Sequence, residues 1–546
     1  MNKAWPFLSR AGRFERHLDV CIVLFLAIFV GFTAARIDYS IPPMEDAAML
    51  MRYAGHVAEG AGCVWNVGDR PVDGATDFLF MAVTALLTKA GLSLEASVRL
   101  IGLVSHGLTV VIVYVALRTL YEAYRIPALI SALYLAFGPG LLYITACFGT
   151  PFFALFACIT WWIALKLLQQ DKNRHLLSLL FAVSGLITGL IRPEGVILAS
   201  LMLLSIVCYR GVRRSLVPVL YFGGIFLFLG GWYFVWRWQY FGYPLPNPFY
   251  KKGGGTLHMA GLVSSLRYAV VLTLPFLATF FSGVRSRQTL RLLLCFSIPL
   301  GGFVAAFVLL SNEMNIAGRF QYAILPMMLI CWYPLVKGIC NDFHLPKWSE
   351  LDRYQHASLV LFAVALSFGT LGYMVVVRTR TPFRFYRDGR YEVARMLSDY
   401  RGKGYTIATT EAGLLPLYSG WRALDTWGLN DQWIAHHGTI TPEYLARYKP
   451  EIIVSHSLSS PFALAKNGLK GWMDMMRIVH GYAENNDYVL AAAFGRCPDD
   501  THCYYVRRDF ADAEEIVRRI RSTEYPWCAD GQAACNFALP TNRSPD

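Results

Sequence analysis

Eleven apolar runs, each of roughly 20 residues, dominate the sequence and limit what the chain can fold into. A helical run of this length matches the hydrocarbon thickness of a bilayer. With 55% hydrophobic and 16% charged residues over 546 positions, the chain is too apolar for one soluble domain. We predict a polytopic α-helical membrane protein with about eleven transmembrane helices, which begin near Leu18, Val98, Pro127, Pro151, Leu176, Gly195, Leu216, Leu262, Leu290, Tyr322 and Ala357.

Lysine and arginine gather in the connectors at every second boundary between these runs. Cytoplasmic loops of membrane proteins carry such an excess, so the N-terminus is predicted to be cytoplasmic and the chain end to lie outside. The net charge of +13 follows the same clusters, and nucleic acid is therefore not an expected partner. The clusters are Arg118/Arg125, Lys166/Lys172/Arg174, Arg210/Arg213/Arg214, Arg285/Arg287/Arg291 and Lys337/Lys347/Arg353.

A shorter apolar stretch from Phe78 to Ala90 does not fit the count of spans. Counting it as a span would invert every later loop and place the basic clusters outside. We interpret it as a re-entrant or interfacial helix. The sequence is thereby divided into a transmembrane domain, residues 1–377, whose first outer loop covers residues 38–97, and an extracytoplasmic domain, residues 378–546.

The outer domain has the pattern of a small α/β fold. Helical patterns cover Tyr391 to Tyr400 and Ala511 to Ile520, and strand-like apolar runs occur at Tyr405 to Thr409, Glu451 to Ser455, Tyr488 to Phe494 and Cys503 to Val506. The pairs Cys497/Cys503 and Cys528/Cys535 suit either disulfides or a metal. Neither pair has CxxC spacing, and two disulfides are favoured, which would place this region in an oxidising compartment, in agreement with the predicted outer location of the domain.

The first outer loop carries the main candidates for chemistry. Glu45 and Asp46 stand at the start of an amphipathic helix, where carboxylates also serve as simple caps. The functional alternative is a general base for an acceptor hydroxyl, or a pair of oxygen ligands for a divalent cation such as Mg²⁺, Mn²⁺ or Ca²⁺. Asp73 and Asp77 are turn residues when taken singly, but as a group they suit a polar substrate pocket.

Three further outer loops place cations at the membrane edge. Arg192 and Glu194 flank a helix boundary and can be structural or functional, and Arg319 suits a bidentate phosphate contact. Lysines near lipid can also attract anionic headgroups. Rings that stack on sugars next to cations that hold phosphate fit a glycosyl-phosphate site, and the loop that combines them contains Asn247, Tyr250, Lys251 and Lys252.

A set of short motifs resembles bacterial membrane glycosyltransferases of the GT-C fold, most closely the group of mycobacterial terminal arabinofuranosyltransferases. The motifs are Glu45-Asp46-Ala47 through Arg52-Tyr53-Ala54, Trp65-Asn66-x-Gly68, Asp77-Phe78-Leu79, Arg192-Pro193-Glu194-Gly195, Leu245-Pro246-Asn247-Pro248-Phe249-Tyr250-x-Lys252, Gly318-Arg319-Phe320, Gly413-x-x-Pro416-x-Tyr418-Ser419-Gly420-Trp421-Arg422 and Leu424-Asp425-x-x-Gly428-Leu429-Asn430-Asp431.

The resemblance implies an inverting transfer of a sugar, such as arabinofuranose or another pentose, from a polyprenyl-phosphate donor. It implies Asp46 as the catalytic base with Glu45 as its partner, and Lys251, Lys252, Arg319 and Arg192 on the donor phosphate. Asp73, Asp77, Asn247, Tyr250 and Glu194 are the candidate substrate-binding residues. The acceptor is a cell-envelope glycan, lipid or protein, and the protein is expected to be a multi-pass protein of the bacterial inner membrane.

This sequence departs from the pattern of the family at two places. Its first acid is Glu45 where relatives often have Asp, and Gly149 stands where many relatives have Glu. The segment from Asp425 to Asp431 is expected to pack the outer domain over the site. Two other classes remain open, a transporter or flippase of lipid-linked sugars and a membrane-bound binding module, although ionisable groups gather at the outer edge rather than along a midplane path.

Overall fold

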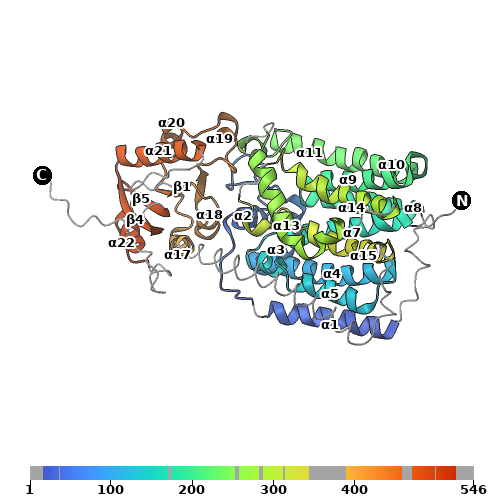
Figure 1. The fold of residues 1–546 in the computed structure, drawn as a ribbon. Coiled ribbons are helices and arrows are strands. Elements are labelled where there is room, and N and C mark those ends of the chain that lie inside the picture. Colours follow the sequence, from blue (N-terminus) through green and yellow to red (C-terminus); the bar gives the residue numbers. More distant parts are fainter. Residues whose placement is uncertain are drawn as a thin grey trace.

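A body of long helices forms one part of the molecule, and a domain built around a β-sheet is attached to one end of it (Figure 1). This computed structural model describes residues 16–35, 37–169, 174–252, 257–281, 287–310, 314–342, 389–457, 470–497 and 500–523. The predicted domain boundary at residues 377/378 lies outside these ranges.

The helical body follows the predicted apolar runs. Seven helical segments of the described chain are long and apolar enough to cross a membrane, so the count of eleven is not established. The segments are α1 (Arg16–Ala34), α4 (Leu94–Tyr121), α5 (Arg125–Ala136) with α6 (Gly140–Thr145), α7 (Thr150–Gln169), α8 (Arg174–Ile191), α10 (Val212–Ile225) with the π-helical turn Phe226–Gly230 and α11 (Gly231–Phe241), and α14 (Arg287–Ala306).

Three more predicted spans coincide with helices that fall short of that criterion over their described residues. These helices are α9 (Glu194–Arg210), α13 (Met259–Phe281) and α15 (Ile324–Asp342), and the 3₁₀ turn Ile316–Gly318 precedes α15. The predicted span near Ala357 lies outside the described residues.

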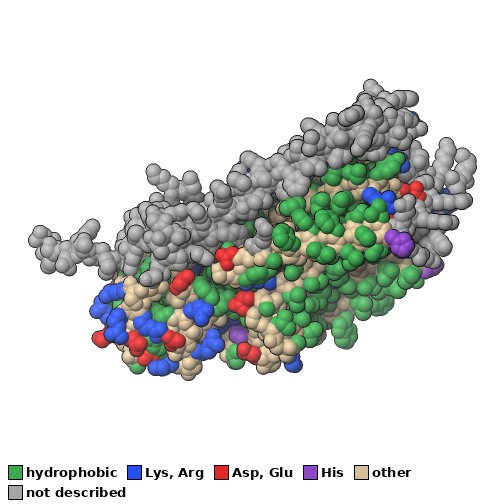
Figure 2. Space-filling model, turned by 90° about the horizontal axis from the view of Figure 1, so that it is seen from below, with side chains coloured by type: hydrophobic (Ala, Val, Ile, Leu, Met, Phe, Trp, Pro, Cys, Tyr) green, Lys and Arg blue, Asp and Glu red, His purple; other side chains and the backbone are tan. Residues whose placement is uncertain are grey.

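The described surface of the helical body is largely apolar, whereas charged side chains gather on the C-terminal domain (Figure 2). Along the helix from α10 to α11, Phe228 and Trp232 are 74% and 78% exposed. Large apolar side chains exposed in such numbers would be unfavourable in water but match the interior of a bilayer. The multi-pass membrane character predicted from the sequence is thus supported by the packing.

The N-terminal end of α1 lies at the end of the body that is distant from the C-terminal domain (Figure 1). Asp19, in the first turn of α1, pairs with Arg118 at 2.9 Å and with Arg125 at 3.6 Å. At the same end, the Arg291 side chain donates to the Tyr209 carbonyl. The predicted separation of the basic clusters from the candidate site is therefore present, while the compartment at each end remains a prediction.

The first loop forms two helices, of which the first contacts α18 (Leu414–Ser419) of the C-terminal domain and the second packs on α4 and α8 of the body. The two helices are α2 (Glu45–Ala58), the predicted amphipathic helix, and α3 (Phe78–Lys89), a 12-residue helix where a short apolar helix was expected. A helix of 12 residues rises about 18 Å, which is too little to cross a bilayer. The loop after α11 forms the short helix α12 (Asn247–Lys251).

The C-terminal domain is the predicted α/β fold, with a five-stranded mixed sheet in the order β2-β1-β3-β5-β4. Strand β1 is parallel to both β2 and β3, whereas β5 is antiparallel to β3 and β4. The strands are β1 (Thr406–Thr409), β2 (Arg422–Asp425), β3 (Ile452–Ser457), β4 (Tyr488–Cys497) and β5 (Asp500–Arg507).

The helices of this domain are short. They are α17 (Arg390–Leu397) followed by the 3₁₀ turn Ser398–Tyr400, α18 (Leu414–Ser419), α19 (Gln432–His437), α20 (Pro442–Tyr448), α21 (Lys470–Asn485) and α22 (Ala513–Arg521).

The predicted disulfide between Cys497 and Cys503 is wrong. Cys503 is a buried free thiol. In the β4–β5 hairpin Cys497 stands opposite Asp500 and Cys503 opposite Ala493, so the two cysteines are three residue pairs apart. That separation is about 10 Å along the strand, beyond the Cα distance that a disulfide spans. Cys528 and Cys535 lie outside the described residues.

A buried arginine on α2 fastens the C-terminal domain to the body. Arg52 donates to the carbonyl oxygens of Trp65 at 2.8 Å and Trp421 at 2.9 Å, to that of Pro416, and to Asn66 Oδ1 at 3.1 Å. Burial lowers its pKa to about 10, so the guanidinium stays protonated at neutral pH. Its donors thus join α2 to the first loop, to α18 and to the residue before β2.

The Asn66 side chain extends the same junction to the edge of the sheet. Its Oδ1 accepts from the Ala423 backbone N–H at 2.8 Å, and its Nδ2 donates to the Ala423 carbonyl at 3.1 Å. A side-chain amide therefore pairs with edge strand β2 as a neighbouring strand would. The Trp65 indole N–H donates to the same carbonyl at 2.9 Å.

We expect Arg52→Met to loosen the docking of the C-terminal domain. The substitution leaves buried carbonyls of two segments without a donor, and the expected loss of stability is at least about 2 kcal/mol. A lower melting temperature in detergent and faster limited proteolysis between the domains would show it. The exposed Arg70 of the same loop provides the control, because Arg70→Met should change stability by less than about 0.5 kcal/mol. Equal behaviour of both variants would contradict the role of Arg52.

Candidate active site

Asp46, in the first turn of α2, forms an ion pair with Arg319, which follows the 3₁₀ turn before α15. Arg319 is buried, and its Cζ lies 4.0 Å from the centroid of the Phe148 ring. Its Nε has no hydrogen-bond partner within the described part of the chain. The structure therefore brings together the predicted base and one predicted phosphate ligand.

A second ion-pair group joins three more of the predicted residues. Arg192 contacts Glu194 at 2.6 Å and Asp77 at 3.4 Å. The Cζ atoms of Arg192 and Arg319 lie 4.8 and 4.9 Å from the centroid of the same Phe320 ring. Two guanidinium groups and three carboxylates thus converge at one end of the helical body.

Burial and mutual attraction act in opposite directions on these groups. Burial raises the pKa of Asp77, and the charge of Arg192 opposes the rise. Burial by itself would lower the pKa of Arg192, but Asp77, Glu194 and Asp46 raise it overall. Arg192 is therefore a permanent cation in this group.

Asp77 lies beside the position where the sequence lacks the acid of its relatives. A Cβ built on Gly149 would lie 2.8 Å from the Phe80 ring and 3.2 Å from Asp77 Oδ2. A larger side chain at position 149 would therefore collide with that ring. The carboxylate near this backbone position is instead supplied by the first loop.

Glu45, by contrast, is engaged by the C-terminal domain. One carboxylate oxygen lies 2.8 Å from Arg390 Nη1, and the other accepts from the backbone N–H groups of Gly413 at 2.6 Å and Leu414 at 3.1 Å. Glu45 thus stabilises the N-terminus of α18, a cap for another helix than its own. A Cβ at position 413 would strike Glu45, so the close approach requires glycine. The two carboxylates of the predicted cation site are each paired with a different arginine, Asp46 with Arg319 and Glu45 with Arg390, and a cation shared between them stays a prediction.

Asp73 also has a structural partner that the sequence did not reveal. Both of its oxygens accept from Arg237 of α11, one of them from Nε at 2.6 Å. Burial raises the pKa of Asp73, and the bidentate contact with Arg237 opposes the rise. The Asp73 carbonyl accepts from the Asn247 N–H at 2.9 Å, while the buried Asn247 Nδ2 has no partner within the described ranges.

The predicted lysines and tyrosine of α12 lie against the C-terminal domain. Lys251 Nζ donates to the Gly438 carbonyl and lies 4.1 Å from the centroid of a Trp427 ring. The Tyr250 ring lies 4.3 Å from that of His436. Lys252 is the residue that follows α12, and it is partly exposed. Among the predicted phosphate ligands, Arg192 and Arg319 form one group, and Lys251 is engaged elsewhere.

The segment from Asp425 to Asp431 contacts α2, and its placement over the site stays a prediction. Its own acids are structural, since Asp425 accepts from the backbone N–H groups of Trp427, Gly428 and Asn430. Asn430 Nδ2 lies 3.1 Å from the Met49 sulfur of α2. The loop is therefore shaped by Asp425 and covers the first-loop helix.

A cluster that the sequence analysis did not single out lies in the C-terminal sheet. Glu411, His456 and His502 come from the end of β1, from β3 and from β5, and one ligand atom of each lies within 4.8 Å of the others. Burial by itself would raise the pKa of Glu411, but Arg390, His456 and His502 hold it well below its usual range. These are residue types that bind transition metals.

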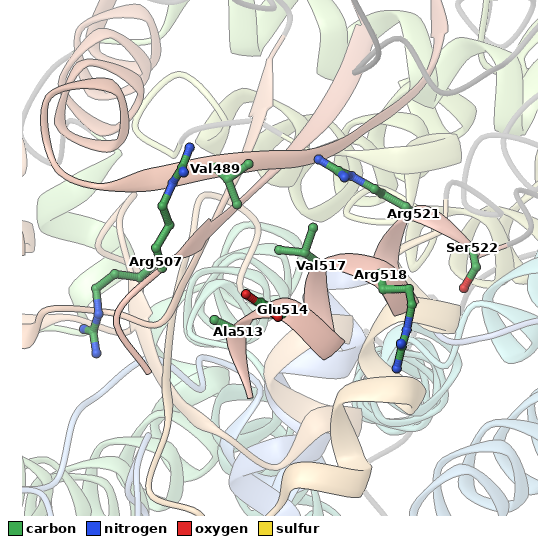
Figure 3. Close-up of a pocket in the computed structure, with 9 residues that line it drawn as sticks. Val489, Arg507, Ala513, Glu514, Val517, Arg518, Arg521 and Ser522 are labelled. Atoms are coloured by element: carbon green, nitrogen blue, oxygen red, sulfur yellow. The ribbon is translucent and has the colours of Figure 1, made fainter. Parts of the chain in front are cut away.

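An open pocket of about 620 Å³ lies between α22 and strands β4 and β5 (Figure 3). None of the predicted site residues lines it. Its walls include Arg507, Arg508, Arg518 and Arg521 together with Val489, Ala513, Glu514, Val517 and Ser522. The pocket is thus separate from the ion-pair groups around Asp46.

The arrangement of helices and C-terminal domain is the GT-C glycosyltransferase fold, as the sequence motifs predicted. No curated protein matches this chain. A family model described as a domain of unknown function, DUF8728, matches residues 381–511. The comparisons with solved structures therefore show the fold, and they do so at low sequence identity.

Among solved structures, apo ArnT from Cupriavidus metallidurans is similar with a TM-score of 0.56 and 14% identity over 89% of this chain and 97% of its own. ArnT bound to undecaprenyl phosphate gives 0.56 and 13%, over 90% and 98%. The oligosaccharyltransferase AglB from Archaeoglobus fulgidus, in complex with an inhibitory peptide and a dolichol-phosphate, gives 0.52 and 11%, over 91% and 75%. These likenesses show the fold, while sugar and acceptor stay predictions.

The Asp431 carboxyl group gives a testable pH dependence. Burial raises the pKa of Asp431 from 3.8 to about 6. The hydrogen bonds from the Ile434 N–H and the Tyr444 hydroxyl oppose this rise but do not cancel it. Between about pH 4 and pH 6 the folded state holds a proton that the unfolded state has lost, so stability falls as pH rises, by up to about 3 kcal/mol. Above about pH 6 both states have lost the proton, so this contribution to the free energy of unfolding no longer changes with pH.

We therefore expect Asp431→Asn to be more stable relative to the wild type at pH 7 than at pH 4.5. The measurement is the melting temperature in detergent at both pH values. Asp487→Asn is the control, because this side chain is 72% exposed. A difference between Asp431→Asn and the wild type that does not change with pH would refute the assignment.

Proposed function

We propose that the protein is an inverting glycosyltransferase that transfers a sugar from a polyprenyl-phosphate donor to an acceptor hydroxyl, with Asp46 as general base. The observation that carries the proposal is the ion pair of Asp46 with Arg319 beside Arg192. It places a carboxylate and two guanidinium groups at the end of an apolar helical body. The guanidinium groups of Arg319 and Arg192 are suited to bind the phosphate of a lipid-linked donor at the membrane edge.

Asp46 is better suited to catalysis than its neighbour. Its side chain is 21% exposed, whereas that of Glu45 is 5% exposed and already accepts from two backbone N–H groups. A general base needs access to the proton that it removes. Asp46 therefore acts on the acceptor, and Glu45 holds the start of α2 in place.

Donor binding and base activation are coupled through Arg319 in this proposal. A phosphate oxygen competes with Asp46 for the guanidinium, and Arg319 Nε, which has no partner among the described residues, offers a further donor. Transfer of Arg319 to the phosphate leaves the Asp46 carboxylate free to accept a proton. The resting ion pair thus keeps the base occupied until the donor arrives.

The chemical step is an in-line displacement at the anomeric carbon. The acceptor oxygen forms a bond to that carbon while the bond to the phosphate oxygen breaks, and the hydroxyl proton moves to Asp46. Arg319 and Arg192 stabilise the negative charge that develops on the departing polyprenyl phosphate.

Lipid-linked donors are supported by the ligands of two proteins with this fold. ArnT was obtained with undecaprenyl phosphate, and AglB with a dolichol-phosphate and a peptide. The sugar favoured by the sequence resemblance is a pentose such as arabinofuranose, and the acceptor is a glycan, glycolipid or protein of the cell envelope. The site then lies on the outer face of the bacterial inner membrane.

Replacement of Asp46 should separate catalysis from folding. Asp46→Asn and Asp46→Ala are expected to lower turnover with a polyprenyl-phosphate sugar by a factor of about 100 to 10,000, because the acceptor loses its base. Donor consumption by purified protein measures the effect. Asp69→Asn, in the same loop and partly exposed beside Arg422, should keep its activity. Near-normal turnover of both Asp46 variants would reject the assignment.

Replacement of Arg319 should weaken donor binding as well as turnover. Lysine cannot offer the planar pair of donors, so Arg319→Lys is expected to raise the KM for the donor by a factor of about 10 to 100. Arg319→Met should be worse, because it also leaves Asp46 without its cation. Steady-state kinetics with varied donor distinguish these outcomes. An unchanged KM in Arg319→Lys would place the phosphate elsewhere.

A further inference from the structure

Three side chains of the C-terminal domain form a constellation that glycosyl transfer does not use. Glu411 Oε2 lies 2.5 Å from His502 Nε2, and Glu411 Oε1 lies 3.1 Å from His456 Nδ1. The two imidazole rings stack with 4.0 Å between centroids and 8° between planes. Both rings therefore direct a nitrogen toward the same carboxylate.

The sheet itself holds this geometry in place. His456 and His502 are directly paired residues of the antiparallel strands β3 and β5, and Glu411 follows β1, the next strand on the other side of β3. The Glu411 backbone carbonyl accepts from the Thr409 hydroxyl at 2.9 Å, and the His456 N–H donates to Thr410 Oγ1 at 2.7 Å. The three groups are thus preorganised by regular structure rather than by a long loop.

We propose that Glu411, His456 and His502 form a binding site for a divalent transition-metal ion, with Zn²⁺ the best match. Two imidazole nitrogens and one carboxylate oxygen are ligands that zinc prefers, whereas Mg²⁺ and Ca²⁺ prefer oxygen alone. Three protein ligands also leave a fourth position open. The side chains of Glu411 and His456 are 15% and 17% exposed, so an ion can enter from the surface.

Charge balance agrees with such an ion. Arg390 contacts both Glu411 and Glu45, so one cation already faces two carboxylates. A divalent ion bound to two neutral imidazoles brings a charge of +2 to the cluster, the same charge that two protonated imidazoles would bring without a metal. With the ion bound, the two stacked rings are neutral and do not repel each other. Metal binding is therefore compatible with the buried arginine.

The site has a direct connection to the first loop. Arg390 forms ion pairs with both Glu411 and Glu45. Glu45 is the first residue of α2, and Asp46 follows it directly. A metal that fixes Glu411 would also fix this chain of contacts. We therefore assign the ion a positioning role for the junction between the C-terminal domain and α2.

The test is metal binding by the full-length, tag-free protein in detergent. After treatment with a chelator and dialysis, one Zn²⁺ per chain should rebind, measured by elemental analysis, and should raise the melting temperature. Co²⁺ in place of zinc should give visible bands of nitrogen and oxygen ligation without a thiolate charge-transfer band. Absence of binding by the wild-type protein would overturn the proposal, and cobalt–thiolate bands would move the site to cysteines.

Variants locate the ion within the chain. His456→Ala, His502→Ala and Glu411→Gln should each weaken zinc binding at least about tenfold. The exposed His437 lies outside the cluster, so His437→Ala should bind as the wild type does. Equal affinity of all four variants would overturn the assignment. Zinc binding is measured without substrate, so its outcome is independent of the proposed glycosyl transfer.

Discussion

The docking of the C-terminal domain on α2 is the contact on which the rest of the structure depends. Arg52 and Glu45 make it from the same helix, one as a buried donor to several backbone carbonyls and the other as an acceptor for the start of α18. A charge buried in this way is stable only when its partners are complete. The two domains therefore fix the direction in which Asp46, the residue after Glu45, faces.

Two adjacent acids acquire opposite roles from this arrangement. Glu45 turns toward the C-terminal domain and loses its access to solvent, whereas Asp46 turns toward Arg319 and keeps part of it. The helix period separates neighbouring residues by about 100°, so consecutive side chains cannot share one environment. The two acids form one motif in the sequence, but in the structure Glu45 is a candidate for a structural role and Asp46 a candidate for a catalytic role.

Local sequence patterns predicted much of the fold. The long apolar runs of the sequence located the helices of the described body. The shorter run that begins at Phe78 was predicted to be a helix too short for a span, and the structure has the 12-residue helix α3 there. Short strand-like apolar runs located four of the five strands of the described sheet. The four-residue strand β2 was missed, because its pairing depends on β1 and on the distant side chain of Asn66. The disulfide at Cys503 was predicted wrongly, since spacing in sequence does not give strand register.

By itself, the sequence indicated the membrane class and the concentration of candidate groups in the first loop, because these follow from composition and residue order. The fold was implied by the resemblance of its ordered motifs to a known family. Only the tertiary structure decided which charges meet. Asp46 and Arg319 are 273 positions apart, and His456 and His502 lie on two strands while Glu411 follows a third. Ion pairs and ligand sets depend on distances of a few ångströms, and strand order and helix packing set those distances.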